Sequence, residues 1–197
     1  MNELEDILGI KFPSNCEVSS VTNTSKKVKK DSLFFGLQGI NEHGSNYALE
    51  ALNLGASLVV HNDKNLKISN KKVFYIKDLE NVLVRFLNSF YKININDNNF
   101  FTFTGTNGKT SSAFLCHQLL TNMEYESIYI GTIGVQHNNK QLQTSYSSNT
   151  TPDIFELFEI VHSCKSMNSL NICIEISSHA LDQKRLEGIH DFYSASI

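Results

Sequence analysis

Short apolar runs alternate with helical patterns in the first half of the chain. Apolar residues dominate the runs at 33–37, 56–60 and 73–76, each of which has the length of a buried strand. A helix is predicted over 46–54, between the first two runs. After Asp78, apolar residues recur at i, i+3, i+4 and i+7, which predicts an amphipathic helix capped by that aspartate. This alternation is typical of an α/β layer structure.

A polar stretch at 92–99 separates these elements from a second series, so a domain boundary is predicted there, with domains at 1–95 and 96–197. The second series comprises a strand at 100–103, helix 109–123, strand 127–130, a long loop, helix 152–167, strand 170–176 and a final strand-like fragment. The predicted fold class is therefore α/β, with a mostly parallel sheet in the second domain.

Composition narrows the class of protein. The chain has 197 residues, of which 41% are hydrophobic and 19% charged, as in ordinary globular proteins. A net charge of -3 gives no general attraction to nucleic acid or to an anionic membrane, so an anionic ligand needs a local site. No apolar run approaches the ~18 residues of a membrane span. No protein partner is predicted.

The cell compartment is predicted from the sequence of the N-terminus and the spacing of the cysteines. The first twelve residues are acidic and lack the order of a secretory signal. The four cysteines have no C-x-x-C spacing, which favours reduced thiols and a cytoplasmic protein. The Asn-rich stretches are attributed to AT-rich coding and carry no functional inference.

A glycine loop follows the predicted strand at 100–103. The segment 105–111 reads GTNGKTS and leads directly into a predicted helix. Glycines let backbone N–H groups face phosphate oxygens, and the helix adds its positive N-terminal end. Lys109 is placed to reach the β- and γ-phosphates, and the Thr110 hydroxyl to ligate Mg²⁺. The alternative, a glycine turn with a surface lysine, does not require this order of strand, loop and helix.

The loop is shorter than the pattern G-x-x-x-x-G-K-[ST], because Phe103 stands at the position of its first glycine. The shorter G-T-x-G-K-T form resembles the ATP loop of the Mur ligases and their folylpolyglutamate synthetase relatives. Three further segments, 131–134 (GTIG), 149–153 (NTTPD) and 175–185 (EISSHALDQKR), resemble in order and spacing the tripeptide-synthetase branch of the Mur ligases.

The N-terminal part is similar to that family's uridine-binding domain at 23–26 and 31–39. The family motif there reads Asp-Ser-Arg, whereas this chain has Thr24, Ser25 and Lys26. Only Ser25 therefore carries over. The resemblance implies a UDP-sugar-binding domain at 1–95 and a partial ATP-binding central domain at 96–197.

The resemblance also implies an activity. It would be an ATP- and Mg²⁺-dependent ligase that adds diaminopimelate or lysine to UDP-N-acetylmuramoyl-L-alanyl-D-glutamate through an acyl phosphate, in peptidoglycan synthesis. Lys109 and Glu175 are the implied catalytic residues, and Thr110 and Glu175 the implied metal ligands. The implied ATP-binding residues are Gly105, Thr106, Asn107, Gly108, Lys109, Thr110 and Ser111. The implied substrate-binding residues are Ser25, Asn149, Thr150, Thr151, Ser177, Gln183 and Arg185.

Several of these positions also have a physical reason to serve a site. Glu175 ends an apolar strand, where ligands of open α/β sheets bind, although it could be a solvated strand end. Thr151 precedes the helix predicted from Pro152 and could cap it. Arg185 offers a planar fork that suits a carboxylate or phosphate. The histidines have no metal-ligand spacing, and no catalytic role is assigned to them.

Length leaves two alternatives open. Family members are more than twice as long, and this chain has no counterpart of their later metal-site segment or amino-acid-binding domain. One alternative is therefore a truncated, inactive nucleotide-binding fragment whose isolated chain has little ligase activity. The other is a different P-loop enzyme, such as a kinase or a folylpolyglutamate synthetase, against which the segments at 149–152 and 177–179 argue.

Overall fold

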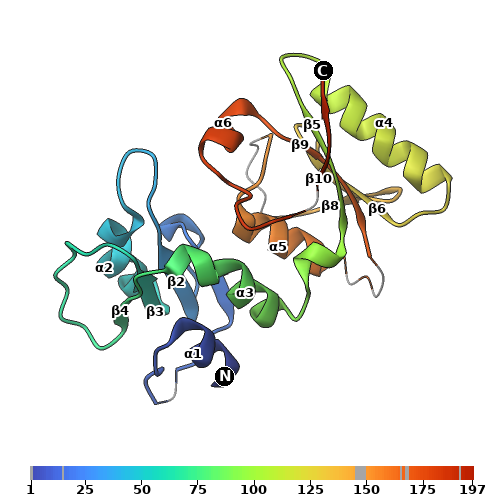
Figure 1. The fold of residues 1–197 in the computed structure, drawn as a ribbon. Coiled ribbons are helices and arrows are strands. Elements are labelled where there is room, and N and C mark those ends of the chain that lie inside the picture. The colour runs from blue at the N-terminus through green and yellow to red at the C-terminus, as the bar shows by residue number, and fades with distance from the viewer. Residues whose placement is uncertain (1, 15, 145–149, 165, 167–168, 191) are drawn as a thin grey trace. The chain divides into compact units, whose positions relative to one another are not determined.

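The computed structural model describes residues 2–14, 16–144, 150–164, 166, 169–190 and 192–197. The chain divides into two compact units, Met1–Phe90 and Tyr91–Ile197, each with a sheet and helices of its own (Figure 1). Within the described residues, every helix is too short or too polar to cross a membrane.

The first unit is built on a four-stranded parallel sheet with strand order β1-β2-β3-β4. Its strands are β1 (Ser20–Thr22), β2 (Ser32–Gly36), β3 (Ala56–His61) and β4 (Val73–Tyr75). Its helices are α1 (Asn2–Leu8), α2 (Ala48–Asn53) and α3 (Leu79–Tyr91), with 3-10 turns η1 (Ser25–Lys27) and η2 (Gly44–Tyr47). Every residue of β2 and β3 is buried, as expected where both faces of a parallel sheet are covered.

The amphipathic pattern after Asp78 forms α3, whose buried face includes Leu83 and Phe86. The ring of Phe86 meets that of Phe35 from β2 edge-on, with centroids 5.2 Å apart. The helix expected over 46–54 is shorter, because its first turn is 3-10. His43 Nδ1 accepts a hydrogen bond from the Ser45 N–H at 3.1 Å and so caps that turn.

The second unit holds a six-stranded sheet with strand order β10-β5-β9-β6-β7-β8. Its strands are β5 (Asn99–Thr104), β6 (Ser127–Gly131), β7 (Gly134–His137), β8 (Lys140–Leu142), β9 (Asn171–Glu175) and β10 (Phe192–Ser196). Its helices are α4 (Lys109–Asn122), α5 (Ile154–Ser163) and α6 (Ser178–Asp182), with a 3-10 turn η3 (Ile95–Asp97). Strands β10, β5, β9 and β6 are parallel, which confirms the α/β class with a mostly parallel sheet.

Helix α4 lies on one side of this sheet, and α5 and α6 lie on the other (Figure 1). The parallel strands therefore have helices on both faces, with Ile128, Ile172 and Ile174 fully buried between them. The carboxyl ends of β5, β6 and β9 meet at one edge, where the loops to α4, β7 and α6 begin.

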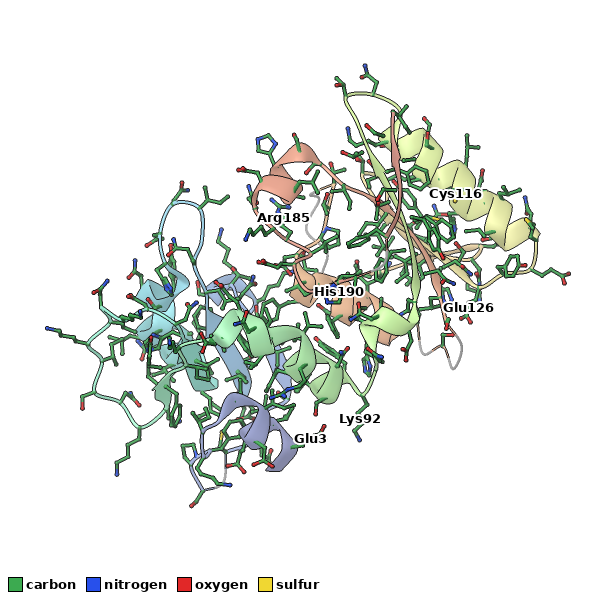
Figure 2. All side chains as sticks on the ribbon, viewed as in Figure 1. Glu3, Lys92, Cys116, Glu126, Arg185 and His190 are labelled. Atoms are coloured by element: carbon green, nitrogen blue, oxygen red, sulfur yellow. The ribbon has the colours of Figure 1, made fainter. Side chains whose placement is uncertain are left out.

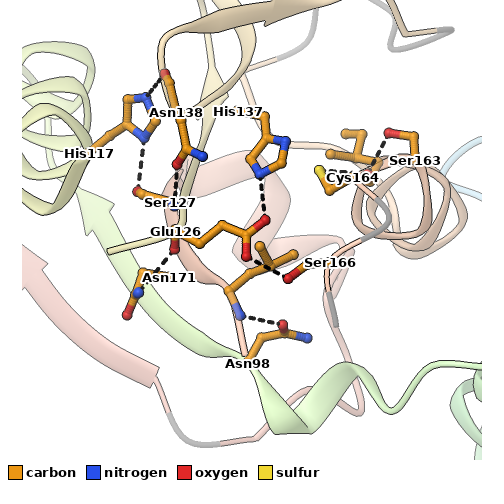
Figure 3. Close-up of polar contacts among 12 residues, drawn as sticks. Asn98, His117, Glu126, Ser127, His137, Asn138, Ser163, Cys164, Ser166 and Asn171 are labelled. Carbon is orange, nitrogen blue, oxygen red and sulfur yellow. Dashed lines mark hydrogen bonds and ion pairs between the residues drawn. The ribbon is translucent and has the colours of Figure 1, made fainter. Parts of the chain in front are cut away.

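The long loop expected after residue 130 contains an antiparallel hairpin, β7–β8, that extends the sheet beyond β6. Asn138 in its turn has a φ of 50°, a left-handed conformation that asparagine tolerates. Polar contacts fix the turn to the sheet: the Asn138 side chain accepts from the Ser127 N–H at 2.9 Å, and its carbonyl contacts His117 Nε2 at 3.0 Å (Figure 3). Asn138 therefore has a structural role in this turn.

Glu126 precedes β6 and joins the hairpin to the loop before β9 (Figure 3). Its carboxylate contacts His137 Nε2 at 2.9 Å and accepts a hydrogen bond from Ser166 Oγ at 2.7 Å. Its carbonyl accepts from Asn171 Nδ2 at 3.0 Å. This polar cluster lies where β6 begins, whereas the glycine loop follows the end of β5.

The helix expected over 152–167 is shorter at both ends. It begins at Ile154 because Asp153 accepts from the Glu156 N–H at 2.9 Å, while the Glu156 carboxylate accepts from the Asp153 N–H at 3.1 Å. This reciprocal pair is a capping box. All four cysteines are free.

Candidate active site

The glycine loop joins β5 to α4 at the carboxyl edge of the second sheet. Gly105 has a φ of 136° and Gly108 a φ of 82°. Both values are strained for residues with a side chain, so the conformation of the loop requires glycine at these two positions. Gly108 is the N-cap of α4, and the helix begins at Lys109. The order of strand, glycine loop and helix expected from the sequence is therefore present.

The Lys109 side chain folds back over this loop. Its Nζ donates to the carbonyl oxygen of Gly105 at 2.7 Å and to that of Thr106 at 3.4 Å. The ammonium group is thereby held over the loop backbone at the positive end of α4. Thr106, Asn107 and Ser111 are exposed around it. A polyanion at this point would meet a positive charge and a helix N-terminus.

The Glu175 carboxylate lies next to the start of α4 and is completely buried. Its Oε2 accepts hydrogen bonds from the hydroxyls of Thr110 at 2.8 Å and Thr132 at 3.1 Å. Its Oε1 accepts from the Thr132 N–H at 2.9 Å and from the Tyr129 hydroxyl. The alternative of a solvated strand end is wrong, because the side chain has no exposure to water and is saturated with donors.

Two of these donors, Tyr129 and Thr132, are absent from the site expected from the sequence. Thr132 stands in the segment GTIG, and its position there could have suggested a role. Tyr129 lies in the apolar strand β6 and gives no such signal, because a tyrosine in a buried strand is ordinarily a core residue.

Thr150 and Thr151 reach the same edge of the sheet. Thr132 Oγ1, whose hydrogen goes to Glu175, lies 3.4 Å from Thr150 Oγ1. Thr151 Oγ1 donates to the Glu175 carbonyl at 2.9 Å and accepts from the Ser177 N–H at 3.0 Å. The alternative that Thr151 caps α5 is therefore wrong, since Asp153 does so. Asn149 lies outside the described residues.

The remaining substrate-binding candidates follow β9. The Ser177 hydroxyl caps α6 by accepting from the Ala180 N–H at 3.2 Å. Arg185 donates from Nε to Gln183 Oε1 at 2.8 Å and from Nη1 to the Thr151 carbonyl at 2.9 Å. These two bonds hold the guanidinium half-buried in the loop after α6 (Figure 2). Thr151, Gln183 and Arg185 thus form one connected group.

Ser25 lies in the first unit, as the first residue of η1. It is half-buried, and its carbonyl accepts from the Val28 N–H at 3.1 Å. Thr22 Oγ1 accepts from the Thr24 N–H at 3.2 Å and fixes the approach to this turn. The exposed Lys26 follows, so the turn offers a hydroxyl and an ammonium group at the carboxyl end of β1.

Comparison with known proteins gives two family matches. Residues 17–91 match the model described as "Mur ligase family, catalytic domain", and residues 103–197 match the "Mur ligase middle domain". The two matches follow each other along the chain in separate compact units.

Two curated relatives carry the names of a synthetase and a ligase. UDP-N-acetylmuramyl-tripeptide synthetase 2 of Oceanobacillus iheyensis is 33% identical over 181 residues, which cover 91% of this chain and 36% of that protein. UDP-N-acetylmuramoyl-L-alanyl-D-glutamate--2,6-diaminopimelate ligase of Rhizobium meliloti is 31% identical over an alignment 197 residues long, which covers 95% of this chain and 40% of that protein. The chain thus spans well under half the length of these relatives.

A solved structure supports the fold. One titled as a UDP-N-acetylmuramoyl-L-alanyl-D-glutamate--2,6-diaminopimelate ligase matches with a TM-score of 0.71 at 21% identity, over 98% of this chain and 39% of that chain. Together, the two consecutive family matches, the tripeptide-synthetase relatives and this shared fold show that the chain belongs to the Mur ligase family.

Proposed function

We propose that this protein is an ATP-dependent ligase that joins a diamino acid, diaminopimelate or lysine, to UDP-N-acetylmuramoyl-L-alanyl-D-glutamate. One observation carries the proposal: a glycine loop, a buried carboxylate and a half-buried arginine lie at one edge of one sheet. The hydrogen bond between Thr110 and Glu175 joins the first two. The Arg185 guanidinium donates to the Thr151 carbonyl, and the Thr151 hydroxyl donates to the Glu175 carbonyl. These two bonds connect the arginine to Glu175. The names of the relatives supply the substrates.

ATP is assigned to the glycine loop. The seven residues that would hold its phosphates are Gly105, Thr106, Asn107, Gly108, Lys109, Thr110 and Ser111. Lys109 is the catalytic cation, because its ammonium group lies over the loop and can exchange the carbonyl of Thr106, at 3.4 Å, for a phosphate oxygen. The chain's overall charge of -3 makes such a local cation necessary for binding a polyanion.

Mg²⁺ fits the Thr110–Glu175 pair. Neighbouring ligands of an octahedral Mg²⁺ at ~2.0–2.1 Å lie about 2.9 Å apart. The Thr110 hydroxyl and Glu175 Oε2 are 2.8 Å apart, and both are hard oxygen donors. When bound there, the ion would neutralise charge on the transferring phosphoryl group. Glu175 would contribute the negative charge that such a site needs.

The muramoyl dipeptide is assigned to the loops beside this pair. Thr150, Thr151 and Ser177 offer short polar groups, and Gln183 holds Arg185 so that its guanidinium can bind a carboxylate. Asn149 belongs to the same proposal by its place in the segment 149–153. Ser25 in the first unit is assigned to the uridine end of the substrate, which makes residues 1–95 the UDP-sugar-binding part.

The reaction would proceed in two transfers. The γ-phosphoryl group passes from ATP to the terminal carboxylate of the dipeptide, which releases ADP and leaves an acyl phosphate. The amine of the diamino acid then attacks the acyl carbon, phosphate leaves with the bonding electrons, and the amine loses a proton as the amide forms. The protein's part is to align the reactants and to neutralise charge, for which Lys109 and Arg185 are the available cations.

Binding by this chain tests the proposal. A fluorescent ATP analogue (methylanthraniloyl-ATP) is titrated with wild type, Lys109→Ala and the control Lys140→Ala, whose lysine lies exposed in β8. We expect Lys109→Ala to weaken nucleotide binding by roughly 10- to 100-fold, because a charged hydrogen bond contributes about 1.5–3 kcal/mol. Equal affinities in the three chains would contradict the assignment of the loop.

Calorimetry with UDP-N-acetylmuramoyl-L-alanyl-D-glutamate then tests the substrate. We expect this compound to bind and a pteroylglutamate of similar charge not to bind, with Arg185→Ala losing the interaction. Binding of the folate alone would favour a folylpolyglutamate synthetase. Binding of ATP without either compound would favour another P-loop enzyme.

A further inference from the structure

Tyr129 is the one described side chain that reaches the Glu175 carboxylate from within the sheet. It projects from the middle of β6, is fully buried, and donates its hydroxyl hydrogen to Glu175 Oε1. The other side chains on this carboxylate, Thr110 and Thr132, come from the segments that follow β5 and β6. Core packing alone does not explain why the Tyr129 hydroxyl donates to this carboxylate from inside the sheet.

The four contacts divide the carboxylate into two halves. Oε1 receives the Tyr129 hydroxyl and the Thr132 N–H, both from groups held by the strand and its end. Among the described residues, Oε2 receives only threonine hydroxyls, which can rotate their hydrogens away and offer a lone pair. Oε1 is therefore held in place by Tyr129 and the Thr132 N–H, whereas Oε2 is the oxygen that can coordinate a cation.

The Tyr129 ring is held from the side of α4. Phe114 packs against it edge-on, with centroids 5.4 Å apart and an interplanar angle of 90°. The His117 ring lies 6.3 Å from it. Two residues of α4 therefore fix the ring whose hydroxyl fixes Glu175. The same helix carries Thr110, so both halves of the cation pair are set by one element.

Gly131 makes the space for this arrangement. A Cβ at Gly131 would lie 2.6 Å from Glu175 Cδ and would also meet Glu175 Oε1 and the Tyr129 hydroxyl oxygen. The backbone of β6 thus approaches the carboxylate as closely as a residue without a side chain allows. The tyrosine, the glycine and the glutamate form one packed unit.

We propose that Tyr129 is a positioning residue for the metal site: it holds Glu175 Oε1 so that Oε2 faces the same point as the Thr110 hydroxyl. This inference rests on the proposed Mg²⁺–ATP function and deepens it. Without the tyrosine hydroxyl, the carboxylate keeps one strand-held donor on Oε1 and can turn about its last torsion. Removing such a supporting contact typically lowers metal affinity by about 10- to 100-fold.

Nucleotide titrations separate this role from general damage. Methylanthraniloyl-ATP binding is measured in EDTA and then as a function of Mg²⁺, for wild type, Tyr129→Phe and the control Tyr125→Phe, whose ring is exposed beyond the end of α4. We expect Tyr129→Phe to keep the metal-free affinity and to raise the half-saturating Mg²⁺ concentration about tenfold. An unchanged Mg²⁺ dependence would overturn the inference.

Terbium luminescence gives a second readout that does not depend on nucleotide. The chain has seven tyrosines and no tryptophan, so light absorbed near 280 nm reaches a bound Tb³⁺ only from a nearby tyrosine. We expect sensitised emission from wild type, its displacement by Mg²⁺, and its loss in Tyr129→Phe but not in Tyr125→Phe. Emission that survives in Tyr129→Phe would place the cation elsewhere and overturn the inference.

Glu175→Gln distinguishes the two proposals. If Glu175→Gln removes the Mg²⁺ dependence and Tyr129→Phe does not, only the role of Tyr129 is wrong. If neither variant changes the Mg²⁺ dependence of wild type, the metal site itself is wrong. Should Tyr129→Phe unfold at the assay temperature, Phe114→Leu loosens the same ring without touching the Glu175 oxygens, and the same increase in half-saturating Mg²⁺ is expected.

Discussion

At the scale of single residues, the site depends on a carboxylate that is buried among neutral donors. Glu175 is contacted by the hydroxyls of Thr110, Tyr129 and Thr132 and by one backbone N–H. Burying an ionised carboxylate is costly unless each oxygen is hydrogen-bonded. These hydrogen bonds offset the cost of burying the Glu175 carboxylate next to the glycine loop.

Thr110 provides a first residue-scale prediction. Thr110→Val keeps the shape of the side chain but removes the hydroxyl that lies 2.8 Å from Glu175 Oε2. We expect the Mg²⁺ dependence of nucleotide binding to be lost, whereas Thr110→Ser, which keeps the hydroxyl, retains it. Isothermal titrations at several Mg²⁺ concentrations measure both. A valine variant with the Mg²⁺ response of wild type would show that the hydroxyl is not a ligand.

Gly131 provides a second prediction at the scale of single residues. Gly131→Ala forces a methyl group against Glu175 and Tyr129, so we expect a loss of stability of about 1–3 kcal/mol, as for overpacked cores. Urea unfolding measures it. The control is Gly9→Ala, where a Cβ has no atom within 4 Å but the backbone φ is 66°. Gly131 does not have a left-handed φ, so backbone strain cannot explain a loss there, and a Gly131→Ala variant as stable as wild type would contradict the close approach.

The residues of the site were predictable where a sequence motif specifies the backbone conformation. The glycines at 105 and 108 have left-handed φ values that the motif implies. Tyr129 was not predictable, because its role depends on which strand lies beside β9, and that pairing is a property of the folded sheet. Thr151 was predictable as a polar residue but not in its contact, since Asp153 satisfies the helix N-terminus instead.

At the scale of elements, local polar contacts decide where helices and hairpins begin. Helix α3 was predictable from its apolar stripe, and α4 from the glycine loop that precedes it. The β7–β8 hairpin was not, because its strands are short and polar and its turn is held by Ser127 and His117 from other elements. Asn138 was the available signal, since asparagine favours a left-handed turn residue.

The capping box of α5 gives an element-scale prediction. Asp153→Ala removes the side chain that accepts from the Glu156 N–H at 2.9 Å. We expect a loss of about 1 kcal/mol in the free energy of unfolding, within a range of 0.5–2 kcal/mol. Urea denaturation is the measurement, with Asp182→Ala as the control because that aspartate is exposed at the end of α6. A larger effect in the control would refute the assignment of the cap.

At the scale of the whole molecule, two units with separate cores each bury a histidine. In the first unit, burial lowers the pKa of His61, opposed in part by Asp63, while His43 lowers it further. His61 Nδ1 is buried without a hydrogen-bond partner among the described residues. In the second unit, burial lowers the pKa of His117, opposed in part by its contact with the Asn138 carbonyl. The α/β layers were predictable from the sequence, but these burials were not, because both histidines lie in otherwise unremarkable segments.

Acid sensitivity follows from these two histidines. A histidine whose pKa is lower in the folded state than its ordinary 6.5 binds more protons when the chain unfolds. Its contribution to stability is therefore complete above pH 6.5 and is lost as the pH falls from 6.5 toward the folded-state value. We expect the urea midpoint to fall between pH 7.5 and about 5.5, and His61→Phe to show a smaller fall, because its ring does not titrate. An equal fall in both chains would exclude His61 as a source of the acid sensitivity and leave His117 and the carboxylates to explain it.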